Sequence, residues 1–356
     1  MIKVLIDLRM VRGRLHGIAR YALELARRLP ALQPSWEFVG LAGPNGVPQD
    51  LGELQPQIPL VNCAAEFLSP LEQPALLASL MRVSCDIFHA TSFSLPALWP
   101  GRLVATLHDA THLALRSTYS LGRLAYYRLI VGPRAWAAAA LISPSEFSRA
   151  ELSKHLGLDP FRFQVIRPGV DASYRPPTVS EVQSFRQARR LPSRYFVAVG
   201  NAKPHKNLAL LARLAAALPI PIAIAAGAGG KTALGFPSST IELPTLPEAE
   251  MPLLYGAATA LLFPSQYEGF GLPVLEAMAA GCPVIASKAA SIPEVAGDVA
   301  ELLPPEDMDA WREAALRVIR DDSRRREMSE RGIARAARFS WPECARQTLA
   351  VYARVL

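Results

Sequence analysis

Two glutamates, Glu268 and Glu276, lie eight positions apart in residues 264–284, which read PSQYEGFGLPVLEAMAAGCPV. Between them, Gly271 can adopt backbone conformations that other residues avoid. Pro273 suits the first turn of a helix, where its missing N–H is not needed. The segment therefore predicts a loop, a short helix and then a buried strand, with both carboxylates near the start of the helix.

The start of this helix is a candidate anion site. Backbone N–H groups near Phe270, Gly271 and Leu272 should lack helical partners there, and the helix dipole favours negative charge. Two carboxylates beside an anion site indicate a ligand that carries both phosphates and hydroxyl groups, such as a sugar nucleotide. In the structural alternative, Glu276 only favours the first helical turn and Glu268 is a solvated loop residue.

A second candidate site lies in GNAKPHKNLALL, residues 200–211, which follows an expected strand and opens a helix. Lys203, His205 and Lys206 cluster where anions bind, and Asn207 is expected to cap the helix. The pattern predicts a diphosphate clamp, with a solvated basic turn as the alternative.

The segment TLHDATHL, residues 106–113, offers His108, Asp109 and His112 at the end of an expected strand. This set is too weak a pattern to indicate a metal site. We expect His108 to contact a substrate, and a purely structural histidine is the alternative.

Composition favours a globular protein with an anionic partner. The 356 residues exceed one ordinary core, so two domains are expected. The formal charge is +7, which favours nucleic acid, a phosphorylated metabolite or an acidic membrane as partner. The four cysteines show neither metal-ligand spacing nor a dense disulfide framework, so a reducing cytoplasm is expected.

Two basic segments, residues 9–21 and 122–136, interleave arginine with aromatic residues. This mixture suits an anionic membrane surface. No nucleic-acid-binding signature accompanies it, and an ordinary basic surface is the alternative. The apolar run 208–229 contains Arg213 and two prolines, so we expect a helix and a strand there instead of a membrane span.

Expected strands alternate with helices along the chain, which predicts an α/β protein with mostly parallel sheets covered on both faces. We expect two doubly wound, Rossmann-like domains facing across a cleft, at residues 1–172 and 173–340, followed by a helix over 341–356. The strands are expected at residues 3–8, 37–43, 86–90, 102–109, 140–145, 195–200, 220–227, 240–246, 260–265 and 283–287.

Together these motifs resemble the retaining glycosyltransferases of family 4, which have the GT-B fold. The first half carries the resemblance in GIARY, DIFHA, TLHDATHL, SPSEFSRAEL and VIRPGVD. The second half carries it in VGNAKPHKN and in FPSQYEGFGLPVLEAMAAGCPVIAS, which has the E-x7-E spacing of the family. The resemblance covers nearly the whole chain and implies that the last helix crosses back to the first domain.

The resemblance also implies roles for matching residues. Glu276 would bind the donor ribose, and Glu268 would bind hydroxyls of the transferred sugar. Lys206 and nearby amides would neutralise the diphosphate, while His108 would lie beside the reacting carbon. The implied catalytic residues are His108, Lys206 and Glu268. The implied donor-binding residues are Gly17, Gly200, Lys203, His205, Lys206, Thr245, Leu246, Glu268, Phe270, Gly271, Leu272 and Glu276.

Two residues depart from the family pattern. His205 replaces a common arginine, which shifts the charge at the diphosphate to Lys206 with Lys203 as a helper. Ala19 replaces the second glycine of a GIGRY motif. The implied mechanism uses no metal and no cofactor beyond the donor. The leaving phosphate takes the proton of the acceptor in a same-face displacement, and Glu268 is not a covalent nucleophile.

The expected function is transfer of a hexose, best taken as mannose from GDP-mannose, to a lipid-linked saccharide or polysaccharide acceptor. The resemblance places it in bacterial envelope or exopolysaccharide synthesis, in the cytoplasm, peripheral at the inner face of the membrane, with no nucleic acid partner. Three alternatives stay open: a UDP- or dTDP-dependent glucosyl- or rhamnosyltransferase, a GT-B nucleotide-sugar epimerase, and a non-enzymatic protein that binds anions or membranes.

Overall fold

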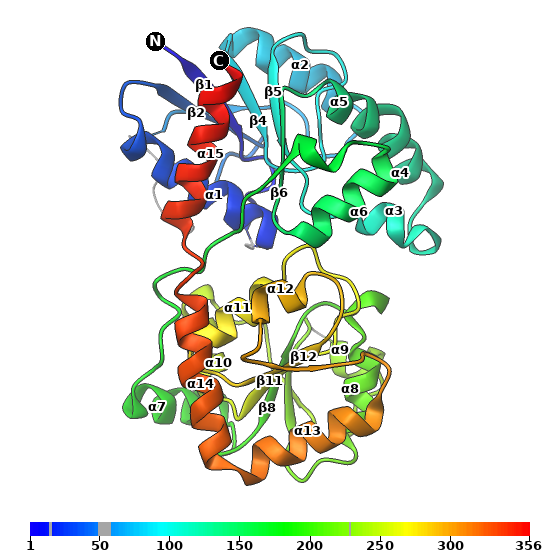
Figure 1. Cartoon of the computed structure of the whole chain (residues 1–356), viewed down its shortest axis with the longest axis vertical. Helices are drawn as coiled ribbons and strands as arrows, with labels where there is room; N and C mark the ends of the chain where they lie inside the picture. The colour runs from blue at the N-terminus through cyan, green and yellow to red at the C-terminus, as the bar shows by residue number, and fades with distance from the viewer. Residues whose placement is uncertain (14–15, 49–57, 228) are drawn as a thin grey trace. The chain divides into compact units, whose positions relative to one another are not determined.

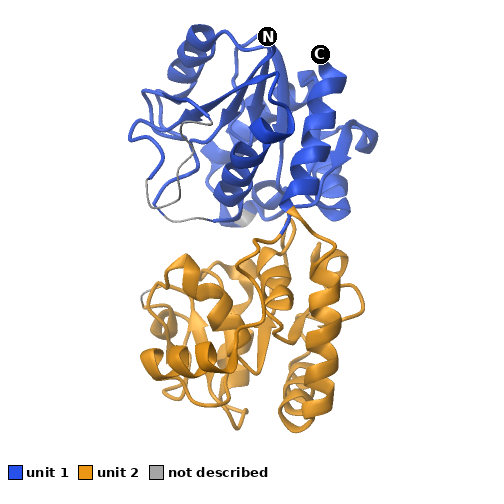
Figure 2. Cartoon of the chain, turned by 90° about the vertical axis from the view of Figure 1, so that its left-hand side faces the viewer, with its two compact units in different colours: residues 1–169, 341–356 blue, residues 170–340 orange. Residues whose placement is uncertain are grey.

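The computed structural model describes residues 1–13, 16–48, 58–227 and 229–356. The chain forms two compact units, which Figure 2 colours separately. Unit 1 contains residues 1–169 and 341–356, and unit 2 contains residues 170–340. The chain thus leaves unit 1 once and returns to it for its last helix (Figure 1).

Unit 1 is built on a seven-stranded parallel sheet with the strand order β3-β2-β1-β4-β5-β6-β7. Its central strands are buried on both faces, as is usual when helices cover a parallel sheet. The strands are β1 (Lys3–Asp7), β2 (Glu37–Ala42), β3 (Leu60–Asn62), β4 (Ile87–Ala90), β5 (Arg102–Thr106), β6 (Ala140–Ser143) and β7 (Phe163–Val165).

The helices of unit 1 cover both faces of this sheet. They are α1 (Gly17–Leu32), α2 (Glu72–Val83), α3 (Thr111–Ala114), α4 (Leu121–Tyr126), α5 (Gly132–Ala137), α6 (Glu146–Leu156) and α15 (Trp341–Val355), with 3₁₀ turns η2 (Arg116–Thr118) and η4 (Pro160–Arg162). Helices α4 and α5 are joined without a break by a π-helical turn, η3 (Tyr127–Val131).

Alternate residues of the unit 1 strands point into two separate apolar clusters, one on each face of the sheet. One cluster packs against α1 and α15, and it includes Trp341 and Tyr352 from α15. The other packs against α2, α5 and α6. The last helix of the chain is therefore part of the core of unit 1.

Unit 2 has a six-stranded parallel sheet with the order β10-β9-β8-β11-β12-β13. Both units are thus Rossmann-like, which confirms the expected α/β class with two doubly wound domains. The strands are β8 (Phe196–Val199), β9 (Ile222–Ala225), β10 (Ile241–Glu242), β11 (Ala260–Phe263), β12 (Val284–Ser287) and β13 (Glu301–Leu303).

The unit 2 sheet also carries an apolar cluster on each face. Its helices are α7 (Val179–Arg189), α8 (Leu208–Ala215), α9 (Gly230–Ala233), α10 (Met251–Gly256), α11 (Leu272–Ala279), α12 (Ile292–Ala296), α13 (Met308–Arg320) and α14 (Asp322–Ala336), with 3₁₀ turns η5 (Pro204–Lys206) and η6 (Glu248–Glu250). The apolar run 208–229 divides into α8 and β9, and none of the described helices combines the length and apolar character that crossing a membrane requires.

Asn207 is the N-cap residue of α8, as its place before the helix predicted, but its side chain does not cap the helix. Asn207 occupies the N-cap position with a positive φ of 51°, and its side chain makes no capping hydrogen bond. Its amide Nδ2 instead donates to the Pro305 carbonyl at 2.9 Å. Asn207 therefore ties the turn after β8 to the segment that precedes α13.

Candidate functional site

The strand order of unit 2 reverses between β8 and β11, because the chain extends from β8 to β9 and β10 on one side and from β11 to β13 on the other. Loops that leave such a reversal at the carboxyl ends of the strands commonly form ligand sites in open α/β sheets. Here the two loops are held together, because Gln266 N donates to the His205 carbonyl at 2.7 Å and Ser265 Oγ donates to the same carbonyl at 3.3 Å.

Lys206 and Glu268 form an ion pair between these two loops. Lys206 Nζ lies 2.7 Å from Glu268 Oε1, and the two side chains are only 19% and 12% exposed. The Glu268 carbonyl also accepts a hydrogen bond from Ser291 Oγ at 2.9 Å. Glu268 is therefore a positioned, partly desolvated carboxylate, and its interpretation as a solvated loop residue is wrong.

The loop after β11 presents a row of backbone amides at the start of α11. Gly271 is the N-cap residue with φ of 102°, a conformation that favours glycine. Among the described residues, no acceptor is found for the backbone N–H groups of Phe270, Gly271 or Leu272. The Phe270 ring is buried against Phe339, so Phe270 offers its backbone alone to a ligand.

Glu276 lies in the second turn of α11, so it does not serve the first-turn role of the structural alternative. Tyr255 of α10 donates its hydroxyl hydrogen to Glu276 Oε2 at 3.2 Å. Burial, and then the nearby Glu276 carboxylate, raise the pKa of Tyr255 well above its usual value. Tyr255 therefore stays a neutral donor that orients Glu276, and no sequence motif marked this tyrosine.

The remaining expected donor-binding residues of unit 2 lie in loops at the same edge of the sheet. Gly200 follows β8 with φ of 144°, and Lys203 is exposed just before η5. Thr245 is exposed after β10, whereas Leu246 is half-buried against the core. The sheet thus brings the unit 2 candidates to one edge, while Gly17 and His108 belong to unit 1.

His108 follows β5 and is held as a neutral donor. Its Nε2 lies 2.9 Å from the Thr91 carbonyl, which can only accept, so Nε2 carries a proton. Burial lowers the pKa of His108, and the ring of Tyr21 packs edge-on against it at 5.0 Å between centroids. Nδ1 is then available as an acceptor. Gly17 is exposed as the first residue of α1.

His112 and Asp109 form hydrogen bonds to other protein groups. His112 Nδ1 lies 2.9 Å from the Tyr127 hydroxyl, and Arg123 donates to its Nε2 at 3.0 Å. Asp109 accepts from Thr111 N at 2.7 Å. Across the described residues, no group of three or more His, Cys, Asp and Glu side chains is arranged to hold a metal ion.

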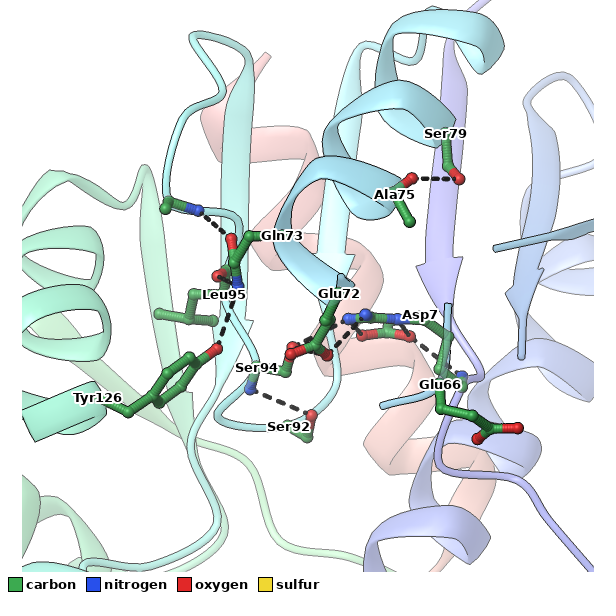
Figure 3. A network of polar contacts seen from close by, with 12 residues as sticks. Asp7, Glu66, Glu72, Gln73, Ala75, Ser79, Ser92, Ser94, Leu95 and Tyr126 are labelled. Atoms are coloured by element: carbon green, nitrogen blue, oxygen red, sulfur yellow. Dashed lines mark hydrogen bonds and ion pairs between the residues drawn. The ribbon is translucent and has the colours of Figure 1, made fainter. Parts of the chain in front are cut away.

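Unit 1 holds a buried ion network that sequence reasoning missed (Figure 3). Arg9 is fully buried, with Nη2 at 2.7 Å from Asp7 Oδ2 and Nη1 at 2.9 Å from Glu72 Oε1. Ser94 Oγ donates to Glu72 at 2.6 Å. Burial alone lowers the pKa of Arg9, but Asp7 and then Glu72 raise it above its ordinary value overall. The network fills the position beside β1 and β4 where the strand order of unit 1 reverses.

The basic segment 9–21 therefore does not form the surface that its composition suggested. Arg9 is buried in the ion network, and Arg20 is only 9% exposed. Arg12 is exposed and pairs with Glu66 at 3.1 Å. Arg14 lies outside the described residues. Spacing along the sequence could not show that Glu72, 63 positions from Arg9, closes the network.

His89 is a second buried group that links distant segments of unit 1. Its Nδ1 lies 2.6 Å from the Tyr352 hydroxyl of α15, and its Nε2 lies 2.8 Å from Thr106 Oγ1. Tyr21 also contacts Thr106, at 3.0 Å between the two hydroxyls. Burial lowers the pKa of His89 to about 3, so the ring is neutral in the folded protein.

Solved structures first define the class of protein. The chain resembles sucrose-phosphate synthase from Thermosynechococcus elongatus with a TM-score of 0.81 at 19% identity, covering 100% of this chain and 99% of that one. It resembles Anabaena Alr3699/HepE in complex with UDP-glucose with a TM-score of 0.77 at 19% identity, covering 99% and 100%. These likenesses confirm the GT-B fold.

Family models then identify the chain. Residues 15–174 match the model described as Glycosyltransferase Family 4, and residues 179–335 match the model described as Glycosyl transferases group 1. The chain is 29% identical over 382 residues to O-antigen chain mannosyltransferase B of Escherichia coli, covering 98% of this chain and 99% of the relative. The protein belongs to the family 4 glycosyltransferases and is an enzyme of the hexosyltransferase type.

Proposed function

We propose that the protein transfers a hexose from a nucleotide-sugar donor to a saccharide acceptor, with mannose from GDP-mannose as the best candidate. The observation that carries this proposal is the Lys206–Glu268 pair beside backbone amides at the start of α11 that have no acceptor among the described residues. The loops after β8 and β11 thus offer positive charge and N–H donors for a diphosphate. They also offer a carboxylate for sugar hydroxyls. The relative named as an O-antigen chain mannosyltransferase supports mannose.

The donor roles follow from the contacts of each residue. Glu276, oriented by Tyr255, would accept hydrogen bonds from the ribose hydroxyls. Lys206, with Lys203, His205 and Gly200 around it, would bind the diphosphate. Thr245 and Leu246 would contact the base. Because Lys206 already neutralises Glu268, a bound diphosphate would share the ammonium group while Glu268 turned to the sugar.

In the proposed mechanism, the bond between the sugar carbon and the diphosphate breaks, and the diphosphate keeps the electron pair. Lys206 and the α11 amides stabilise the negative charge that develops on it. The acceptor hydroxyl attacks from the same face, and its proton passes to the leaving phosphate oxygen. The configuration is retained, no metal takes part, and Glu268 forms no bond to the sugar. His108 and Gly17 would complete the surroundings of the reacting carbon.

The proposed acceptor is a lipid-linked saccharide or a polysaccharide of the bacterial envelope, with the enzyme cytoplasmic and peripheral at the inner face of the membrane. A UDP-sugar donor is the second candidate, because the HepE structure is described in complex with UDP-glucose. No nucleic acid partner and no cofactor other than the donor are proposed.

Thermal stabilisation by GDP, UDP, dTDP and ADP tests the donor site, because a ligand that binds the folded state raises the melting temperature. We expect GDP to give the largest shift with the wild type and a much smaller one with Glu276→Ala. Glu313→Ala is the matched control, because Glu313 is an exposed glutamate on α13 of the same unit. Absence of a shift with every nucleotide, in a folded protein, would contradict the proposal.

Replacing Lys206 tests the leaving-group role. Lys206→Ala should lower turnover by roughly 10²-fold, because loss of one positioned donor to a developing anion has about this effect. Lys203→Ala, which removes a more exposed lysine three positions earlier, should cost much less. Equal turnover for Lys206→Ala and wild type would remove Lys206 from this role.

A further inference from the structure

Helix α4, the turn η3 and helix α5 form one helical segment over residues 121–137 with two distinct faces. The side chains of Tyr127, Val131 and Ala135 recur every four positions and are buried in the core of unit 1. This spacing places them on one stripe of the helix. The segment is thus anchored firmly along one side, and its other side is available.

The opposite side of the segment is apolar and strongly exposed. Leu121 is 84% exposed, Leu129 is 72% exposed and Trp136 is 71% exposed. Leu98, which is 75% exposed, lies next to Trp99, whose carbonyl accepts from Arg134 of α5. Large exposed apolar side chains grouped on one element mark interaction sites more often than isolated ones do. We call Leu121, Arg128, Leu129 and Trp136 the α4–α5 face.

The charged residue exposed on the α4–α5 face is an arginine. Residues 110–145 contain four arginines and no aspartate or glutamate. Arg123 and Arg134 are half-buried and bonded within unit 1, whereas Arg128 is exposed on the face itself. Within the described part of the chain, Arg128 has neither an ion pair nor a hydrogen bond. An apolar surface that carries an exposed arginine complements an apolar layer bordered by negative charge.

We propose that the α4–α5 face docks the enzyme on the surface of a bilayer that contains anionic lipids. Leu121 and Leu129 would enter the boundary between headgroups and acyl chains, and Trp136 would lie at the interface, where its ring is favoured. Arg128 would contact the negatively charged headgroups. Docking on the membrane would hold the enzyme beside a membrane-linked acceptor, so this proposal rests on the proposed function.

The structure favours the α4–α5 segment as a membrane surface over residues 9–21, the other segment that mixes arginine with aromatic residues. Arg9 and Arg20 in residues 9–21 are buried, and the exposed arginine among the described residues of that segment, Arg12, pairs with Glu66. The α4–α5 face joins charge and apolar surface in one helical segment. A patch that pairs two copies of the chain would not need an arginine without an ion pair among the described residues, and a second copy as occupant becomes an outcome of the test.

Co-sedimentation of the full chain with vesicles tests the proposal. The vesicles contain phosphatidylcholine alone or phosphatidylcholine mixed with phosphatidylglycerol, and no nucleotide is added. We expect binding to the mixed vesicles that weakens as salt is added. Leu121→Ser, Leu129→Ser and Trp136→Ser combined should lower this binding at least tenfold. Arg128→Ala should lower it about fivefold on mixed vesicles and not on neutral ones.

Matched control variants test whether a loss of vesicle binding is specific to residues of the α4–α5 face. Leu71→Ser, Met81→Ser and Val179→Ser combined remove three other exposed apolar side chains, and Arg326→Ala removes another exposed arginine. Both controls should bind vesicles as the wild type does. Equal losses in the controls, or no binding by the wild type, would overturn the proposal.

A change in oligomeric state on replacing the face, measured by light scattering and without vesicle binding, would assign the face to a second copy and also overturn it. Thermal stabilisation by nucleotide in the same variants distinguishes the two proposals. Variants that no longer bind vesicles but are still stabilised by nucleotide would show that the donor site is intact. If the wild type binds vesicles but is not stabilised by any nucleotide, the proposed donor site is contradicted and the proposed membrane face is not.

Discussion

At the scale of single residues, the two strand-order reversals use charge in opposite ways. Arg9 of unit 1 is fully buried and divides its donors among Asp7, Glu72 and Ser94, so little capacity is left for a ligand. Lys206 of unit 2 is partly exposed and bonds to Glu268. The first arrangement fixes structure, and the second leaves charge accessible to a substrate.

Replacing Arg9 should destabilise the protein strongly. In Arg9→Met, Asp7 and Glu72 would become buried carboxylates without their partner, which should cost about 3–5 kcal/mol of unfolding free energy. Arg12→Ala, which breaks an exposed pair with Glu66, should cost no more than about 1 kcal/mol. Urea titration followed by circular dichroism measures both. A similar decrease in unfolding free energy in the two variants would mean that the buried ion pairs of Arg9 do not stabilise the fold.

His89 should make stability fall in acid. Its pKa is about 3 when folded and 6.5 ordinarily, so between these values the unfolded chain binds a proton that the folded protein excludes. Unfolding free energy should therefore fall as pH drops below 6.5, by up to about 1.4 kcal/mol per pH unit for this group. His89→Gln should show a shallower decline in urea titrations across this window. An unchanged slope in the variant would exclude His89 as the source.

Residue chemistry was predictable from the sequence where it depends on neighbours along the chain. Gly271 before a helix and a lysine after a strand follow from local pattern, and both lie where that pattern places them. The partners of Arg9 and Glu276 did not follow, because Glu72 and Tyr255 come from other elements that packing brings close. Composition alone therefore assigned Arg9 to the surface.

At the scale of elements, the interior strands and the edge strand β10 were predictable, whereas the edge strands β3, β7 and β13 were not. The strands β1 (KVLID) and β12 (VIAS) have apolar central residues and are buried along most of their length, as is usual for parallel strands covered on both faces. The strands β3, β7 and β13 have three residues each and are partly exposed, so they lack both the length and the apolar pattern that mark a strand. Sheet pairing holds them, and that is a tertiary effect.

The turn before α11 should tolerate little change at Gly271. Gly271→Ala places a side chain at φ of 102°, which should cost about 1–2 kcal/mol of unfolding free energy and shift the α11 amides. Gly122→Ala is the matched control, because Gly122 lies inside α4 with open space around it. It should stabilise by about 0.5–1 kcal/mol. Thermal melts with and without GDP measure both effects, and an undisturbed GDP shift in Gly271→Ala would contradict the role of the amides.

At the scale of the whole molecule, the two units differ in how the chain supplies them. Unit 2 is one continuous segment with its own sheet and core, whereas unit 1 needs both ends of the chain. Trp341 and Tyr352 are 1% and 0% exposed in unit 1, so α15 cannot be removed without opening that core.

Fragments should reveal this difference. Residues 170–340 should fold alone and unfold cooperatively, because their core clusters are complete. Residues 1–169 should lack a cooperative transition until a peptide of residues 341–356 is added, which restores Trp341 and Tyr352 to the core. Circular dichroism melts measure both fragments. A cooperative melt of residues 1–169 alone, at the temperature of the full chain, would show that α15 is dispensable.

The return of α15 to unit 1 has a consequence for synthesis on the ribosome. Residues 1–169 of unit 1 are translated before unit 2, but α15, which completes the core of unit 1, is translated after unit 2. Unit 2 can finish folding while the apolar face of α1 is still uncovered. The nascent chain therefore carries an open hydrophobic surface through the translation of residues 170–340, and unit 1 emerges before unit 2 but matures after it.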